Sequence, residues 1–150
     1  MKYCALILVI ALAGVASLSA QTSSVRNIPP GWIDGAESPN LIPDRVAYRL
    51  VFISLMLPDS PDQTAIERQE GHLRQIGLSG ADETVLKQAL AVFAANYAAW
   101  QQTSGTAGEA WNIVQTTQTS LQSRLTSDGN SKFSAYVALA KTHMVVKPRW

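Results

Sequence analysis

The sequence predicts an all-α protein: an up-and-down bundle of four or five helices, preceded by an extended arm that contains prolines. Apolar residues recur at steps of three and four, capping sequences precede several of these stretches, and no stretch after residue 20 alternates like a half-buried strand. The stretch from Leu50 to Leu57 has Ser54 as its single polar residue. A helix there is apolar nearly all round and needs cover on several sides.

Residues 1–20 have the layout of a secretory signal peptide. Lys2 gives a positive start, an uncharged apolar run follows, and small residues stand at Ser17, Ser19 and Ala20, so cleavage is expected after Ser19 or Ala20. The alternative, an uncleaved anchor, is less consistent with the run, which is shorter than the roughly 20 apolar residues of a spanning helix. We therefore expect an exported protein, periplasmic or extracellular, with no membrane segment after signal cleavage.

Removing residues 1–20 leaves 130 of the 150 residues, enough for one domain with one core. The only cysteine of the sequence, Cys4, leaves with the signal, so packing alone must stabilise the mature chain. Loss of Lys2 takes the formal net charge from +1 to 0, and the remaining charges form no long run of one sign. This pattern argues against binding to nucleic acid or to an anionic membrane.

The expected domain organisation is an arm at 21–42 and a helical bundle at 43–150. Prolines and glycines exclude regular helix from the arm. The first helix starts near Pro43, where a missing N–H is harmless, and stops at Pro58. The second starts in a capping box at 60–63 and ends at Gly77. The first helix is predicted to bury Val46, Leu50, Ile53 and Leu57.

The third and fourth helices are predicted to form an antiparallel αα-hairpin. Ser79 caps the third helix, and Thr106 with Glu109 forms a capping box for the fourth. The short connection brings Trp100 and Trp111 to the same end of the bundle. A last helix is expected at 131–146. The expected inward-facing residues of these helices are Leu86, Leu90, Phe93, Tyr97 and Trp100; Trp111, Val114, Gln118, Leu121 and Leu125; and Phe133, Val137, Ala140 and Met144.

The sequence lacks the patterns that carry common catalytic chemistry. His72 stands two and five residues from Glu70 and Glu67, whereas ligands on one helix face are three or four apart. The sequence contains no HExxH pattern, no G-x-S-x-G nucleophile elbow and no glycine-rich phosphate loop. We therefore expect no enzyme activity, no cofactor and no metal site.

Four residues are the candidate binding residues: Tyr97, Trp100, Trp111 and Gln118. Exposed rings would form a flat stacking platform, whereas their place on the core stripes favours a buried aromatic cap. Gln118 is either a polar residue that sets helix register or a donor that lines a pocket.

A second candidate is the group Arg45, Tyr48 and Arg49 on adjacent turns of the most apolar helix. Two guanidinium groups beside a phenol can bind an anion. The pattern favours a simpler arrangement, in which the arginine stems pack along the helix edge and the charged heads stay in water.

The order of signal peptide, proline-rich arm, IPDRVAYRL helix and FSAYVALAKTHM helix resembles uncharacterised secreted all-helical proteins of soil bacteria of the acidobacterial type. This resemblance covers most of the mature chain and implies no activity. A more distant likeness is to periplasmic helical proteins of the Spy and CpxP type, whose signature is LTxxQ. Here Leu125-Thr126 is followed by Gly129 in place of the glutamine, so no functional residue is transferred.

Two functional hypotheses follow. The first is a secreted or periplasmic interaction module that binds another envelope protein or a second copy of itself through an apolar groove. The second is a small-molecule carrier with a pocket between the helices, lined by Gln69, Gln118 and the aromatic residues.

Overall fold

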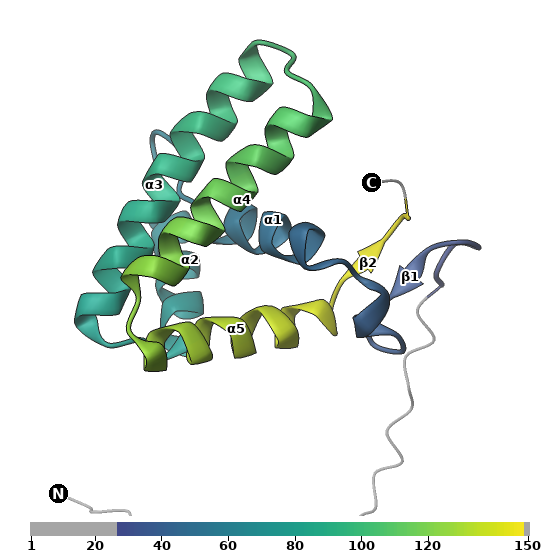
Figure 1. The fold of residues 1–150 in the computed structure, drawn as a ribbon, viewed down its shortest axis with the longest axis horizontal. Helices are drawn as coiled ribbons and strands as arrows, with labels where there is room; N and C mark the ends of the chain where they lie inside the picture. Colours follow the sequence, from purple (N-terminus) through teal and green to yellow (C-terminus); the bar gives the residue numbers. More distant parts are fainter. Residues whose placement is uncertain (1–26, 149–150) are drawn as a thin grey trace, which may run out of the picture.

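The computed structural model describes residues 27–148 and shows an all-α helical bundle of five helices, which confirms the predicted fold class (Figure 1). The predicted signal peptide and the start of the predicted arm lie outside the described residues. The elements in chain order are β1 (Ile33–Asp34), a 3-10 turn (Pro39–Leu41), α1 (Asp44–Leu55), α2 (Gln63–Ile76), α3 (Gly80–Gln102), α4 (Ala107–Arg124), α5 (Ser127–Lys141) and β2 (Val145–Val146).

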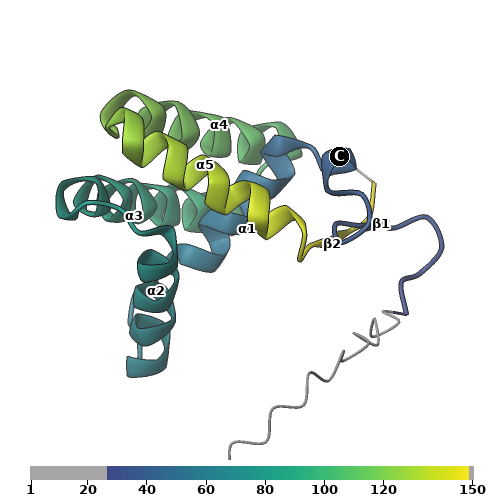
Figure 2. The same ribbon diagram turned by 90° about the horizontal axis from the view of Figure 1, so that it is seen from below.

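Helices α3 and α4 form the predicted antiparallel hairpin, and α1 packs across both of them (Figure 1). Helix α5 starts at the open end of the hairpin and packs on α1 and α2. The capping box of α4 is present, because Glu109 Oε2 accepts from the Thr106 N–H at 2.6 Å and the Thr106 hydroxyl accepts from the Glu109 N–H. The Trp100 indole N–H donates to the Thr106 carbonyl at 2.8 Å, so the ring is tied to the hairpin turn. Viewed after a 90° turn, α2 is steeply inclined to α3 and extends away from the hairpin (Figure 2).

Helix α1 is the centre of the core and packs against every other helix. Phe52 is fully buried, with its ring centroid 5.2 Å from that of Phe93 on α3 and 6.2 Å from that of Phe133 on α5. Tyr48 lies 6.1 Å from Phe133 by the same measure. These rings join three helices, as expected for large side chains that supply much of the apolar burial in a small core.

The prediction of the buried face of α1 is wrong, because the face that is buried is rotated by part of a turn about the helix axis from the predicted one. Of the predicted stripe, Val46 is buried, but Leu50 is 38% exposed, Ile53 is half-buried and Leu57 lies beyond the helix end. A helix that is apolar nearly all round gives no contrast from which its orientation can be read. The residues that α1 buries are Val46, Ala47, Tyr48, Val51, Phe52 and Leu55.

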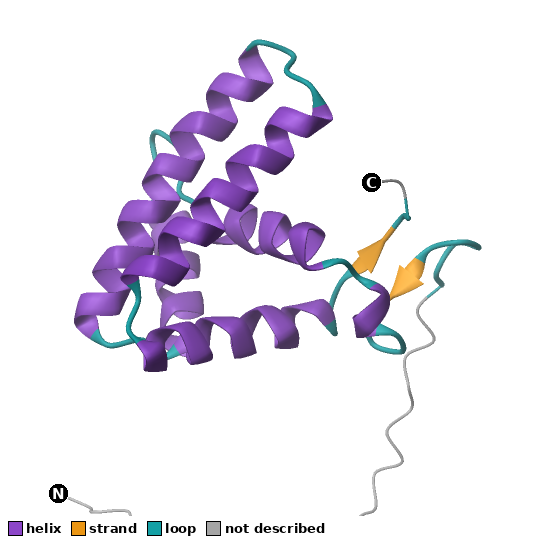
Figure 3. Cartoon of the chain, in the orientation of Figure 1, coloured by secondary structure: helices purple, strands orange, loops and turns teal. Residues whose placement is uncertain are grey.

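The arm and the C-terminal segment pair in a short ribbon that the sequence did not predict (Figure 3). The predicted last helix, 131–146, instead ends at Lys141, and Val145–Val146 pair antiparallel with Ile33–Asp34. The Gly35 N–H donates to the Met144 carbonyl at 2.8 Å and extends this pairing. The arm from residue 27 is therefore docked beside α1 and α5.

Asp82 ties the start of α3 to the start of α5. The carboxylate is buried and accepts from the Thr126 N–H at 2.9 Å, from the Thr126 hydroxyl at 2.6 Å and from the Ser79 hydroxyl at 3.1 Å. Thr126 is the N-cap of α5. These hydrogen bonds, the Thr126 hydroxyl first, lower the pKa of Asp82 from its ordinary value of 3.8.

We predict that Asp82 makes the stability of the fold depend on pH in the acidic range. Because its pKa is lower in the folded chain, the carboxylate stabilises the fold above about pH 4, and this contribution is lost as the pH falls through the folded-state pKa. The difference in Tm between the wild type and Asp82→Asn should stay constant from pH 7 to about pH 5 and shrink below about pH 4. Thermal unfolding followed by circular dichroism measures it. A difference that does not vary with pH would contradict this role.

Candidate functional site

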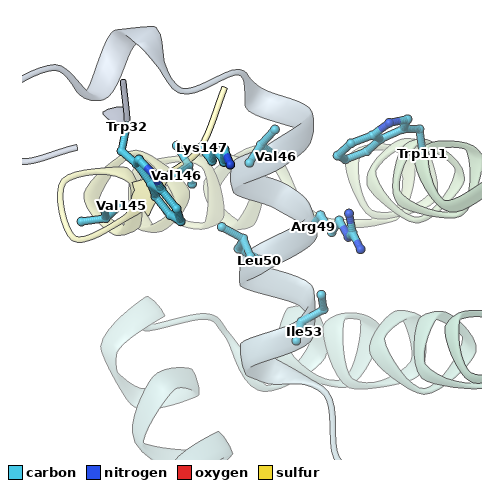
Figure 4. Close-up of a pocket in the computed structure, with 9 residues that line it drawn as sticks. All are labelled: Trp32, Val46, Arg49, Leu50, Ile53, Trp111, Val145, Val146 and Lys147. Carbon is cyan, nitrogen blue, oxygen red and sulfur yellow. The ribbon is translucent and has the colours of Figure 1, made fainter. Parts of the chain in front are cut away.

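The outer face of α1 forms the floor of a groove with a volume of about 390 Å³, which we call the α1 groove (Figure 4). Trp32 from the arm and Trp111 from α4 stand on opposite sides of α1, with Leu50 between them. The groove is lined by Trp32, Val46, Arg49, Leu50, Ile53, Trp111, Val145, Val146 and Lys147.

Large apolar side chains of the groove face solvent. Trp32 is 39% and Leu50 is 38% exposed, and Ile53 is half-buried. On the opposite side of α1, Phe52 is fully buried against Phe93 of α3 and Phe133 of α5. The ribbon makes one wall of the groove, because it places Trp32, Val145 and Val146 beside α1.

Arg49 is held between three aromatic rings. Its Nη2 and Nε donate to the Tyr97 hydroxyl at 2.7 and 3.2 Å. Its guanidinium carbon lies 5.3 Å from the ring centroid of Trp111, 5.6 Å from that of Tyr97 and 5.8 Å from that of Trp100. Each distance is within the range of cation–π attraction. The head of Arg49 therefore packs on rings, in contrast to the expected position in water.

The predicted anion-binding group does not assemble as a unit. Arg45 lies over Trp111, with its guanidinium carbon 5.2 Å from the ring centroid. Tyr48 is buried and belongs to the core instead. Two of the three residues thus meet at one aromatic ring, and the hydroxyl that Arg49 uses comes from Tyr97, on α3.

Three of the four predicted binding residues lie together. Tyr97 is buried, Trp100 and Trp111 are half-buried, and the ring centroids of Tyr97 and Trp100 are 5.1 Å apart. Of the three, only Trp111 lines the α1 groove, while the rings of Tyr97 and Trp100 pack against the guanidinium of Arg49.

The glutamines of the predicted pocket lie elsewhere. Gln118 is half-buried on α4, and the buried polar position beside it is Thr117, whose hydroxyl donates to the Ile113 carbonyl at 2.9 Å. Gln69 is buried and its amide donates to the Leu55 carbonyl at 2.7 Å, so it joins α2 to the end of α1. Neither glutamine lines the α1 groove.

Trp32, Leu50 and Lys147 line the groove although no sequence pattern predicted this. Leu50 was expected in the core. Lys147 stands directly after β2, whose pairing depends on residues more than 100 positions earlier. No local pattern reports such a pairing, because hydrophobic periodicity describes one segment at a time.

The aromatic support of Arg49 gives a stability prediction. Replacing Arg49 by lysine removes the guanidinium donors to Tyr97 and the flat stacking surface, so we expect a loss of about 1 kcal/mol in unfolding free energy. Arg45→Lys is the matched control, since Arg45 is exposed and contacts one ring, and should cost less than about 0.5 kcal/mol. Urea unfolding measures both, and equal losses would contradict the aromatic support.

The two histidines line a second, smaller pocket of about 240 Å³ between α2 and α5. His72 Nδ1 is 2.8 Å from the Tyr136 hydroxyl, and burial raises the pKa of the Tyr136 phenol. His143 lines the same pocket beside Met144, a proximity that the sequence separation of the histidines did not suggest. Within residues 27–148, His, Cys, Asp and Glu side chains form no group of three or more that could hold a metal ion.

No helix within residues 27–148 combines the length and the apolar character needed to span a membrane. Comparison of the chain with protein-family models, with curated proteins and with solved structures finds no match. The function is therefore inferred from the structure of the α1 groove.

Proposed function

We propose that this protein is an exported, non-enzymatic interaction module that binds a partner protein, or a second copy of itself, in the α1 groove. The observation that carries the proposal is the apolar lining of the α1 groove, in which Leu50 of α1 and Trp32 of the arm are each exposed by more than a third. Contiguous apolar surface of this kind is typical of interaction sites.

The composition of the groove supports the proposal. Interface centres are enriched in tryptophan and arginine, which bury large areas and still offer polar groups at one edge. The α1 groove combines Trp32, Trp111 and Arg49 around an aliphatic floor. Arg49 is held by Tyr97 and the rings, so little side-chain freedom remains to be lost on binding.

Photo-crosslinking in the envelope of the producing cell tests the proposal. A benzoylphenylalanine at Leu50 reports partners in the groove, and the same residue at Val92 is the control, because Val92 is 61% exposed on α3 outside the groove. We expect adducts of defined mass from position 50 alone, with a doubled mass if the partner is a second copy. No adduct, or the same adducts from both positions, would contradict the proposal.

The volume of the groove favours a second candidate function, a small-molecule carrier. About 390 Å³ falls within the range of roughly 300–1,000 Å³ that is usual for ligand sites. Native mass spectrometry of protein purified from its own host tests this candidate. A bound species that Leu50→Arg removes would support it, and unliganded protein would contradict it.

A further inference from the structure

The α1 groove carries two cations, Arg49 and Lys147, that have no carboxylate partner within residues 27–148. The lysines at 87, 132 and 141 each have an ion pair, whereas Lys147 has none among the described residues. Arg49 likewise has no carboxylate within 4 Å in residues 27–148. None of the described residues that line the groove is acidic.

The guanidinium of Arg49 keeps donors for a ligand. Of its five N–H groups, the two that bond to Tyr97 are one on Nε and one on Nη2, so three have no partner among the described residues. Arg49 is half-buried and its position is fixed by the rings. A carboxylate that reaches it would form charge-assisted hydrogen bonds, which are stronger than neutral ones.

The two cations stand on different sides of the apolar floor. Figure 4 shows Lys147 near Trp32 on one side of α1 and Arg49 beside Trp111 on the other, with Leu50 and Val46 between them. A ligand that matches this order has an apolar centre between two negative groups.

We propose that the occupant of the α1 groove is a segment of a partner protein in which acidic side chains flank a large apolar side chain. The apolar side chain packs on Leu50 between the two tryptophans, and the carboxylates pair with Arg49 and Lys147. This inference rests on the proposed function and specifies the chemistry of the partner.

The openness of the groove favours a peptide segment over a free small molecule. Small-molecule sites usually enclose 70–90% of their ligand, whereas Trp32, Leu50 and Lys147 are all exposed. A peptide leaves much of its surface in solvent and gains affinity from a few anchors. Two cations also differ from the clusters of four to eight basic residues that bind anionic lipid.

Selection from a random-peptide display library on the purified protein tests the inference. We expect enrichment of Asp or Glu on both sides of Leu, Phe or Trp. In fluorescence anisotropy, a selected peptide should bind at least about tenfold more tightly than its Asn/Gln counterpart, since each paired charge contributes up to roughly 1 kcal/mol at an exposed site.

Two charge reversals provide the matched comparison. Lys147→Glu should weaken peptide binding about five- to tenfold at low ionic strength, and added salt should reduce the effect. Arg68→Glu makes the same charge change on α2, at an exposed residue outside the groove that has no ion pair with residues 27–148, and should leave binding unchanged. Equal effects of the two reversals would overturn the inference, because net charge alone would then explain them.

Other outcomes separate the inference from the proposed function. Selected peptides without acidic residues that still bind at Leu50 would overturn the charge inference and leave the interaction function standing. Selected peptides whose binding is unaffected by Leu50→Arg would show that they bind outside the α1 groove, and this result would contradict the proposed function as well. Binding to phosphatidylglycerol vesicles that depends on Lys147, without any peptide enrichment, would assign the groove to a membrane surface and overturn the peptide proposal.

Discussion

Phe52→Ala is expected to cost about 3–5 kcal/mol of unfolding free energy, a large part of the stability of a domain of this size. Phe52 is fully buried, and its ring contacts Phe93 and Phe133. Its removal therefore leaves a cavity where α1, α3 and α5 meet. Urea unfolding followed by circular dichroism measures the loss. A protein unfolded at 25 °C without denaturant would be an extreme form of the same result.

Leu50→Ala is the matched control on the same helix. Leu50 is 38% exposed and lines the groove, so the truncation should cost less than about 1 kcal/mol. The same variant should lose peptide binding in the groove, because the apolar anchor on the floor is truncated. Similar stability losses for Phe52→Ala and Leu50→Ala would mean that α1 buries the face that its sequence pattern suggested and would remove the basis for the groove.

Local signals allowed most of the helices to be predicted. Ser79 and Thr106 cap α3 and α4 as expected, and Gly77 ends α2 with a φ of 69°. Each feature depends on residues only a few positions apart, so a short stretch of sequence is enough to predict it. The hairpin followed from the short connection, which is why the proximity of Trp100 and Trp111 could be predicted.

The groove could not be predicted because it depends on how distant elements meet. The orientation of α1 decides that Leu50 faces out and Arg49 reaches Tyr97, yet α1 is apolar on almost every side. The ribbon decides that Trp32 and Lys147 stand beside α1, and its paired residues lie more than 100 positions apart. Two residues per strand are too few to show alternation.

The second large effect is expected for Gly35→Ala. A Cβ at Gly35 would fall on the carbonyl oxygen of Lys141 and lie 2.9 Å from that of Met144. Both obstacles are backbone atoms, so no side-chain rotation relieves the clash, and we expect a loss of about 3 kcal/mol or detachment of the ribbon. Hydrogen exchange should then show faster exchange at residues 33–35 and 145–146 while the amides of α3 stay protected.

Gly80→Ala is the control for Gly35→Ala, because a Cβ at Gly80 meets no atom within 4 Å and alanine is the better helix former. It should leave stability unchanged or raise it by up to about 1 kcal/mol. If Gly35→Ala folds with its ribbon detached, Trp32 and Lys147 leave the groove, and peptide binding should fall although Arg49 and Leu50 are intact. Unchanged hydrogen exchange at the ribbon amides would show that the chain tolerates the Cβ. Unchanged peptide binding by a variant whose ribbon is detached would show that α1 and Trp111 form the binding site without the ribbon.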